Sequence, residues 1–165
     1  MATLHPDAHA NGADMQPQIG LIAQYVKDLS FENPNAPAVY QSQSNPRIDV
    51  QFNLAVAAIA DDVHEASMKI EVRALMEGEQ TAFAVELVYA GLFGVRNVAA
   101  DQLQAFMLAE APRLLFPFAR RIVAEVVRDG NFPPLLLDPV DFGAMYAQQA
   151  DQAQQLAGQE PAGQA

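Results

Sequence analysis

The side chains that most often carry out chemistry are few in this sequence and stand far apart. It has 3 histidines and no cysteine, so it lacks a thiol nucleophile, a thiolate metal site and a disulfide framework. His5 and His9 lie in an N-terminal stretch without periodicity, and His64 stands alone on a predicted strand edge. Because no metal-ligand spacing is present, we expect no metal and no cofactor.

Neighbouring carboxylates occur twice, at Asp61-Asp62 and at Glu77 and Glu79. Both places are predicted turns, where acidic residues are usually solvated, and no Ser–His pair has an acid placed to orient it. The GLFG segment, residues 91–94, matches neither a phosphate-binding loop nor a dinucleotide fingerprint. The sequence therefore predicts neither an enzyme nor an ATP-driven machine.

The charge balance argues against a nucleic-acid partner, because 9 basic residues face 20 acidic ones and phosphate binding needs clustered Lys and Arg. Four arginines do fall on one predicted helix, which we interpret as a solvated or interface-lining face. They are Arg113, Arg120, Arg121 and Arg128. Only 18% of the residues are charged while 51% are apolar, which indicates a large core or, as we favour, apolar surface hidden in an oligomer.

Neither a membrane span nor a secretory signal is predicted. The longest apolar run, residues 54–60, is far shorter than the ~20 residues of a spanning helix. Residues 1–17 contain no Lys, no Arg and no apolar stretch, so we expect a cytoplasmic protein without direct membrane insertion. We divide the chain into a disordered tail (1–17), a folded domain (18–146) and a Gln/Ala-rich, largely disordered tail (147–165).

The first half of the domain alternates apolar and polar residues with period two, as strands with one buried face do. The four runs cover residues 19–32, 47–56, 65–74 and 81–89. On the apolar face of the first run we place Ile19, Leu21, Ala23, Tyr25, Leu29 and Phe31, and on its polar face Gln24, Asp28, Ser30 and Glu32. Since no helix separates the runs, they predict an antiparallel sheet with one apolar and one polar face.

Two connections follow from the turn residues. The third and fourth runs are joined by Glu77–Gln80, where Gly78 can adopt a positive φ, and this predicts a hairpin. The first and second runs are separated by a Pro- and Asn-rich connector, residues 33–46, so they need not be neighbours in the sheet.

The second half of the domain changes to a period of 3.6 residues, which predicts helices. The helical pattern covers residues 98–110 and 113–128. We expect Pro112 and Pro117 to kink or split the second stretch, because proline removes a backbone donor and clashes with the preceding turn.

An apolar loop, NFPPLLLDP (residues 131–139), follows where polar turn residues would be expected. It comes after Gly130, a predicted left-handed helix cap, and ends near Asp138, the predicted N-cap of a last helix. Two interpretations stay open: the loop fills the core, or it lines, with the connector, a groove for extended polypeptide. The candidate groove residues are Tyr40, Phe83, Phe116, Phe132 and Leu135. Aromatic rings bury large areas with few rotatable bonds, but Phe83 and Phe116 are equally expected in the core.

Four segments of the domain resemble the SecB family of bacterial protein-export chaperones. They are YVKDLSFENPNAP (25–37), ADDVHE (60–65), QTAFAVELVYAGLF (80–93) and LFPFARRIVAEVVRDGNFPPLLLDPVDF (115–142). The resemblance implies an α+β fold, a four-stranded antiparallel sheet with C-terminal helices packed on one face, assembled as a dimer of dimers. It also implies an ATP-independent cytosolic holdase that keeps unfolded preproteins translocation-competent and delivers them to the SecA ATPase. The basic helix would then be an assembly surface.

The resemblance further implies residues that contact SecA. The family's acidic contact residues match Asp28, Glu32 and Glu86, which lie on the predicted polar faces of the first and fourth strands. Two positions depart from the family. Ala84 stands where a larger apolar residue is common beside the fourth-strand acid, and Ser44 where an aromatic residue is common near the end of the connector.

Other functions stay open beside this one. A SecB-like chaperone that protects an antitoxin or another cytosolic client would share the same sequence pattern. A small-ligand-binding or catalytic α+β domain would need polar groups that converge in a pocket, and a purely structural oligomer would bury its apolar loops completely.

Overall fold

The computed structural model describes residues 15–159. Its strands are β1 (Gln18–Glu32), β2 (Arg47–Ala60), β3 (Val63–Leu75) and β4 (Thr81–Arg96). Its helices are α1 (Ala100–Ala105), the π-helical segment η4 (Phe106–Glu110), α2 (Ala111–Asp129) and α3 (Phe142–Ala157), with short 3₁₀ turns η2 (Ala38–Gln41) and η3 (Glu77–Glu79). No helix among these residues is long and apolar enough to cross a membrane.

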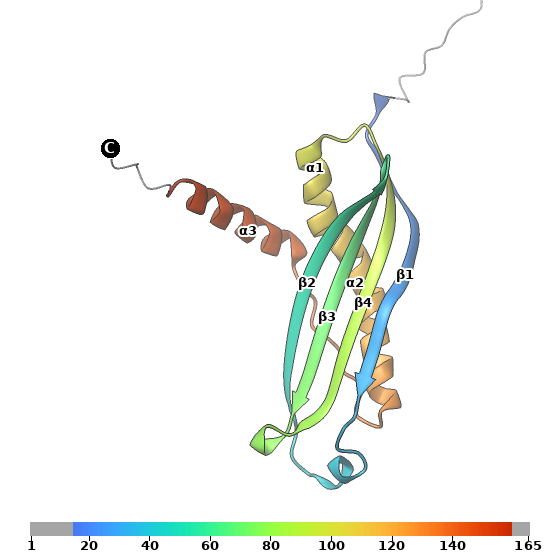
Figure 1. Ribbon diagram of the computed structural model, residues 1–165, viewed down its shortest axis with the longest axis vertical. Coiled ribbons are helices and arrows are strands. Elements are labelled where there is room, and N and C mark those ends of the chain that lie inside the picture. The colour runs from blue at the N-terminus through green and yellow to red at the C-terminus, as the bar shows by residue number, and fades with distance from the viewer. Residues whose placement is uncertain (1–14, 160–165) are drawn as a thin grey trace, which may run out of the picture.

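The strands form one antiparallel sheet in the order β1-β4-β3-β2, and α1 and α2 cover one of its faces (Figure 1). We call the other side the open face. This arrangement confirms the predicted fold. The helix α3 begins against the same core through buried Phe142 and then projects away from the sheet (Figure 1).

The alternation predicted for the two inner strands is confirmed. Along β3 the even-numbered residues from Ala66 to Ala74 are buried beneath the helices, and along β4 the odd-numbered ones from Phe83 to Val95 are. The helix α2 adds Leu115, Ala119, Val123 and Val127 to this core. A single apolar layer between the sheet and α2 therefore holds the domain together.

The edge strand β1 departs from simple alternation, because its register against β4 shifts between Leu21 and Ala23 and again between Val26 and Asp28. Each β-bulge adds a residue and exchanges the two faces of the strand. Ala23 and Tyr25 therefore lie on the open face and Gln24 on the helix side, opposite to what we predicted. The second shift restores the predicted faces of the residues that follow it.

Both hairpin turns contain a residue in the left-handed conformation, which was predicted only for Gly78. Asp62 has a φ of 59° in the β2–β3 turn, and Gly78 has a φ of 77° in the β3–β4 turn. The first strand pairs with β4 rather than with β2, so the 33–46 connector crosses from one edge of the sheet to the other. The predicted β3–β4 hairpin is confirmed, because these two strands pair directly with each other.

The prolines do not split the long helix. The segment η4 precedes α2 without a break, with the Ala111 N–H donating to the Phe106 carbonyl, and Pro112 occupies the first turn of α2, where a missing donor costs little. Pro117 lies inside α2 without ending it.

Two predicted helix caps are wrong. Gly130 has a φ of −77°, and the left-handed residue is Asn131, with a φ of 64°. The N-cap of α3 is Asp141, not Asp138, and its carboxylate accepts the Ala144 N–H at 2.9 Å. The helix begins later than predicted because Leu137 is buried in the core and the chain stays non-helical past Asp138.

The Gln/Ala-rich segment expected to be largely disordered is helical as far as Ala157. Residues 1–14, which make up most of the predicted N-terminal tail with His5 and His9, lie outside the described residues. The division of the chain at residues 17 and 146 stays a prediction.

Candidate functional site

A groove of about 460 Å³ opens between the connector and the apolar loop. Four of the five predicted groove residues line it together: Tyr40, Phe83, Phe132 and Leu135. The remaining lining residues are Val39, Ser42, Gln43, Ser44, Asn45, Pro46, Ile48, Met76, Ala82, Asn131, Pro133 and Pro134. Its centre is therefore aromatic and aliphatic, and its rim on the connector side is polar.

Three rings in contact form the wall and floor of the groove. The Phe132 ring lies 4.8 Å from that of Phe83 and 5.6 Å from that of Tyr40, centroid to centroid. Phe83 is only 3% exposed and belongs to both core and floor, whereas Tyr40 is 40% exposed. Leu137 of the loop is buried in the core, while Phe132 and Leu135 of the same loop line the groove; that the groove binds extended polypeptide stays a prediction.

The connector wall is held in place by side-chain hydrogen bonds. The Tyr40 hydroxyl donates to the Gly130 carbonyl at 2.8 Å and accepts from Asn33 Nδ2 at 2.6 Å. Asn35 Nδ2 donates to the Thr81 carbonyl at 2.8 Å. These bonds fasten an otherwise irregular segment to α2 and β4, so the groove exists before anything binds to it.

Phe116 does not line the groove. It is 7% exposed, and its ring packs 6.1 Å from that of Phe52 and 5.8 Å from that of Phe142. Its place in α2 directs it into the core, so the core interpretation applies to it.

Sequence reasoning missed several groove residues, among them Ile48, Met76 and Ala82. They lie at the ends of three different strands, and the signal that could have identified them is the hairpin turn that brings those ends beside the connector. Ser44, which departs from the family pattern, lies on the rim, and its hydroxyl is 3.0 Å from that of Ser42.

The open face of the sheet has an acidic hollow of about 530 Å³. Its lining contains four carboxylates and one guanidinium, from Glu32, Asp49, Glu71, Glu86 and Arg73. Ala84 also lines it. Asp28 lies on the same face of β1 opposite Val88, but outside the lining of the hollow.

Within the hollow, Glu86 is already paired. Lys69 Nζ lies 2.9 Å from Glu86 Oε1 and 3.1 Å from Glu71 Oε1. The hydrogen bond to Glu86, and after it the one to Glu71, raises the pKa of Lys69 above its ordinary value. The ammonium therefore stays charged at neutral pH and bridges two strands.

A second ionic group lies farther along the open face. Glu65, only 8% exposed, accepts a hydrogen bond from the Tyr25 hydroxyl and pairs with Lys27 Nζ at 2.8 Å. The hydrogen bond from Lys27 is the larger cause, and that from Tyr25 the second, of a pKa of Glu65 below its ordinary value. The hydrogen bond to Glu65 in turn raises the pKa of Tyr25. The group anchors β1 at its second bulge.

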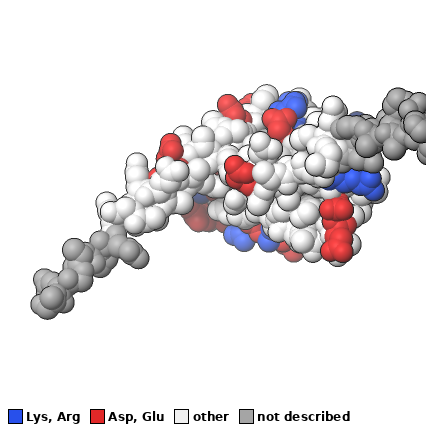
Figure 2. All heavy atoms as spheres, turned by 90° about the horizontal axis from the view of Figure 1, so that it is seen from above, with Lys and Arg blue, Asp and Glu red and all other residues white. Residues whose placement is uncertain are grey.

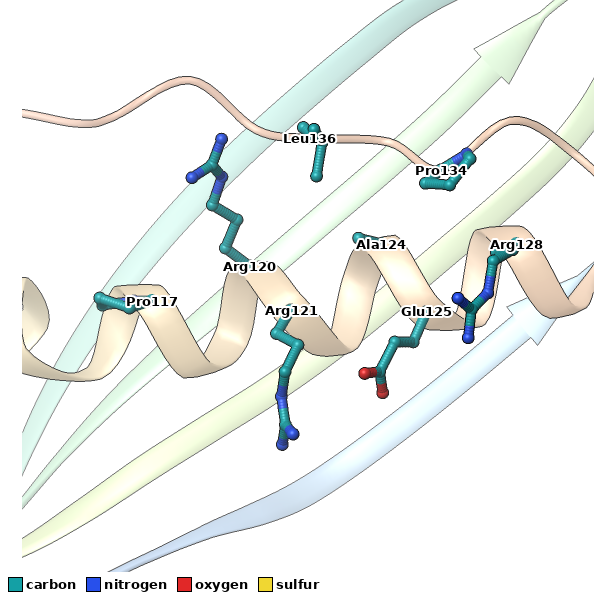
Figure 3. A pocket seen from close by; sticks show the side chains of 8 residues that line it. All are labelled: Pro117, Arg120, Arg121, Ala124, Glu125, Arg128, Pro134 and Leu136. Atoms are coloured by element: carbon teal, nitrogen blue, oxygen red, sulfur yellow. The ribbon is translucent and has the colours of Figure 1, made fainter.

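The basic helix residues border a separate hollow of about 260 Å³ between α2 and the apolar loop. Arg120 points toward the loop at Leu136, whereas Arg121 and Glu125 point to the opposite side of the helix (Figure 3). Arg113 is not part of this group, because it pairs with Glu110 at 2.8 Å. Seen from above, charged side chains form small separate groups on a largely uncharged surface (Figure 2).

No group of three or more potential metal ligands occurs among residues 15–159. His64 is the second residue of β3, near the beginning of the strand, and is half-buried. Its Nδ1 is buried without a hydrogen-bond partner in the described part of the chain.

Comparisons with known proteins agree with this architecture. A protein-export protein SecB from Rhizorhabdus wittichii is 60% identical over 96% of this chain and 95% of its own length. One from Zymomonas mobilis is 57% identical over 95% and 96%. A SecB-like chaperone of Mycobacterium tuberculosis, solved with an antitoxin peptide, covers 74% of this chain and 90% of its own with a TM-score of 0.63. At 18% identity it supports the fold alone.

The family model described as "Preprotein translocase subunit SecB" matches residues 12–153. This match covers the sheet, the groove, the acidic hollow and most of α3. The chain belongs to the SecB family of protein-export chaperones.

Proposed function

We propose that this protein is an ATP-independent holdase of the cytoplasm, which binds unfolded preproteins and delivers them to the SecA ATPase for export. The observation that carries the proposal is the preformed groove, in which the rings of Tyr40 and Phe132 are partly exposed beside a polar rim. The function requires no enzyme activity, cofactor, nucleic acid or membrane insertion.

The groove suits an extended polypeptide rather than one defined ligand. Its rings offer large contact areas that accept many different side chains, while the polar rim can hydrogen-bond a main chain that has no structure of its own. A specific small-molecule site would instead converge several polar groups on one point, and the described lining does not do so.

Assembly into a tetramer, a dimer of dimers, is part of the proposal. Apolar side chains are exposed on β1 and on the neighbouring face of α2: Leu21, Val26, Leu29, Leu114 and Phe118. Such a contiguous surface is unusual for a monomer, so the native mass should be near that of four chains. A monodisperse monomer at micromolar concentration would contradict this part.

Docking to SecA is assigned to the acidic residues Asp28, Glu32 and Glu86 on the open face, with Ala84 beside them. Charges of this kind contribute little individually but steer association with a basic partner. Changing the three acids to alanine should weaken SecA binding and reduce its salt dependence, while the apolar groove keeps its clients. Equal affinities, or a wild-type affinity insensitive to salt, would mean that the acids only keep the protein soluble.

The experiment that tests the holdase function is suppression of aggregation of a denatured preprotein without nucleotide. It should be followed by capture of cytosolic clients with and without SecA. We expect delayed aggregation and release of captured preproteins to SecA. Capture of an antitoxin or other cytosolic client without preproteins would favour the alternative chaperone role, and no effect on aggregation would refute the holdase.

A further inference from the structure

Lys69 lies beside the proposed docking residues on the open face. It lies on the inner strand β3, and its single ammonium contacts Glu86 across the strands and Glu71 on its own strand. An ammonium group has three donors, so it can serve both carboxylates at once.

The strand register explains why a cation is needed at this point. Glu71 and Glu86 are directly opposite each other in the β3–β4 pairing, and like charges in this position repel. Lys69 offsets that repulsion. By contrast, neither Asp28 nor Glu32 forms an ion pair within residues 15–159, so only Glu86 of the three docking acids is already paired.

We infer that Lys69 is an internal competitor for the docking site, and that a lysine or arginine of the basic partner must displace it to reach Glu86. This inference rests on the proposed SecA-docking role of the open face. It also adds Glu71 to the site, because the carboxylate pair released by Lys69 would hold the incoming cation from two sides. Lys69 would thereby set how strongly the face discriminates between partners of different charge.

The test is the affinity of purified SecA for variants of the full chain at low and at physiological salt. Lys69→Gln should tighten binding roughly two- to five-fold, the range expected for removing exposed ion pairs. The double variant Lys69→Gln/Asp101→Asn keeps the wild-type net charge and both carboxylates of the site, because Asp101 lies in α1 on the helix side of the sheet, and it should also bind more tightly. Lys69→Arg, which keeps the cation, should behave like the wild type.

Arg96→Gln is the matched control, because Arg96 is exposed at the far end of β4 and its removal changes the net charge by the same amount. Equal tightening by Arg96→Gln, with none in the double variant, would assign the effect to net charge and overturn the inference. Unchanged or weaker binding by Lys69→Gln would also overturn it. If Glu86→Ala leaves SecA binding intact, the proposed docking role itself fails, which is a separate outcome.

Discussion

Among the glycines within residues 15–159, Gly130 is the one at which an added Cβ would come closest to another part of the chain, so a methyl group there should destabilise the domain. A Cβ at this position would lie 2.3 Å from Cζ and 2.7 Å from Cε1 of Phe31, which sits on β1 beneath the end of α2. The backbone φ of −77° is acceptable to alanine, so the cost of Gly130→Ala should come from this collision alone.

The size of the effect can be worked out from two opposing terms. Overpacking of this kind costs about 1–3 kcal/mol, and the reduced freedom of the unfolded chain returns about 0.4–1 kcal/mol. The net loss should be about 1–2 kcal/mol, which corresponds to a fall of about 2–8 °C in the melting temperature of a domain of this size. Thermal and urea unfolding of the native oligomer would measure it.

Gly158 provides the matched control, because it also follows a helix with nearly the same backbone angles, φ −76° and ψ −8°. A Cβ there would meet nothing closer than the Gln154 carbonyl oxygen at 3.5 Å, so Gly158→Ala should be neutral or slightly stabilising.

A smaller side chain at position 31 should rescue the Gly130→Ala variant. In a Phe31→Leu background the obstructing ring atoms are gone, and Gly130→Ala should cost less than about 0.5 kcal/mol, a coupling that a double-mutant cycle measures. If Gly130→Ala is harmless, or if its cost is the same with leucine at position 31, steric contact with Phe31 is not the reason for glycine.

Three further predictions concern the groove, the core and the open face. Changing Phe132 and Leu135 to serine should weaken client binding several-fold, whereas Leu136→Ser, 65% exposed and outside the groove, should not; collapse of the oligomer would show that the first two only pack. Phe116→Ala should lower the free energy of unfolding by about 3–5 kcal/mol in urea titration, and a loss below about 1 kcal/mol would contradict its burial. Because its lysine and tyrosine partners hold the pKa of Glu65 below 4.5, this carboxylate should stabilise the fold above that pH and lose its contribution as the pH falls through the lowered pKa. The urea midpoint of the wild type should therefore decline more steeply with acid than that of Glu65→Gln, and parallel curves would refute this.

The sequence alone was sufficient for the two inner strands, their hairpin and the helix that covers them. In β3 and β4 every second residue is apolar, and such a period assigns each side chain to a face without knowledge of the rest of the chain. The turn at Gly78 joins the two strands for an equally local reason. The scarcity of histidine and cysteine was visible in the same way.

The edge strand and the helix end required the tertiary structure. Two bulges in β1 exchange the faces of Tyr25 and Gln24, and nothing in the local pattern marks where a bulge will fall. Gly130 follows a helix, and a glycine in that place predicts a left-handed cap. Its contact with Phe31 involves a residue about a hundred positions away, so the local sequence does not reveal it.

For the candidate sites, too, the sequence determined one part and the tertiary structure the other. Composition identified apolar aromatic residues and acidic strand faces, but Phe83 and Phe116 are the same residue type in similar surroundings, and only packing places one in the groove floor and the other in the core. Likewise, Lys69 bridges Glu71 and Glu86 only because the β3–β4 register sets those strands side by side. Periodicity determines which way a side chain faces, whereas its partners depend on register and packing between segments distant in the sequence.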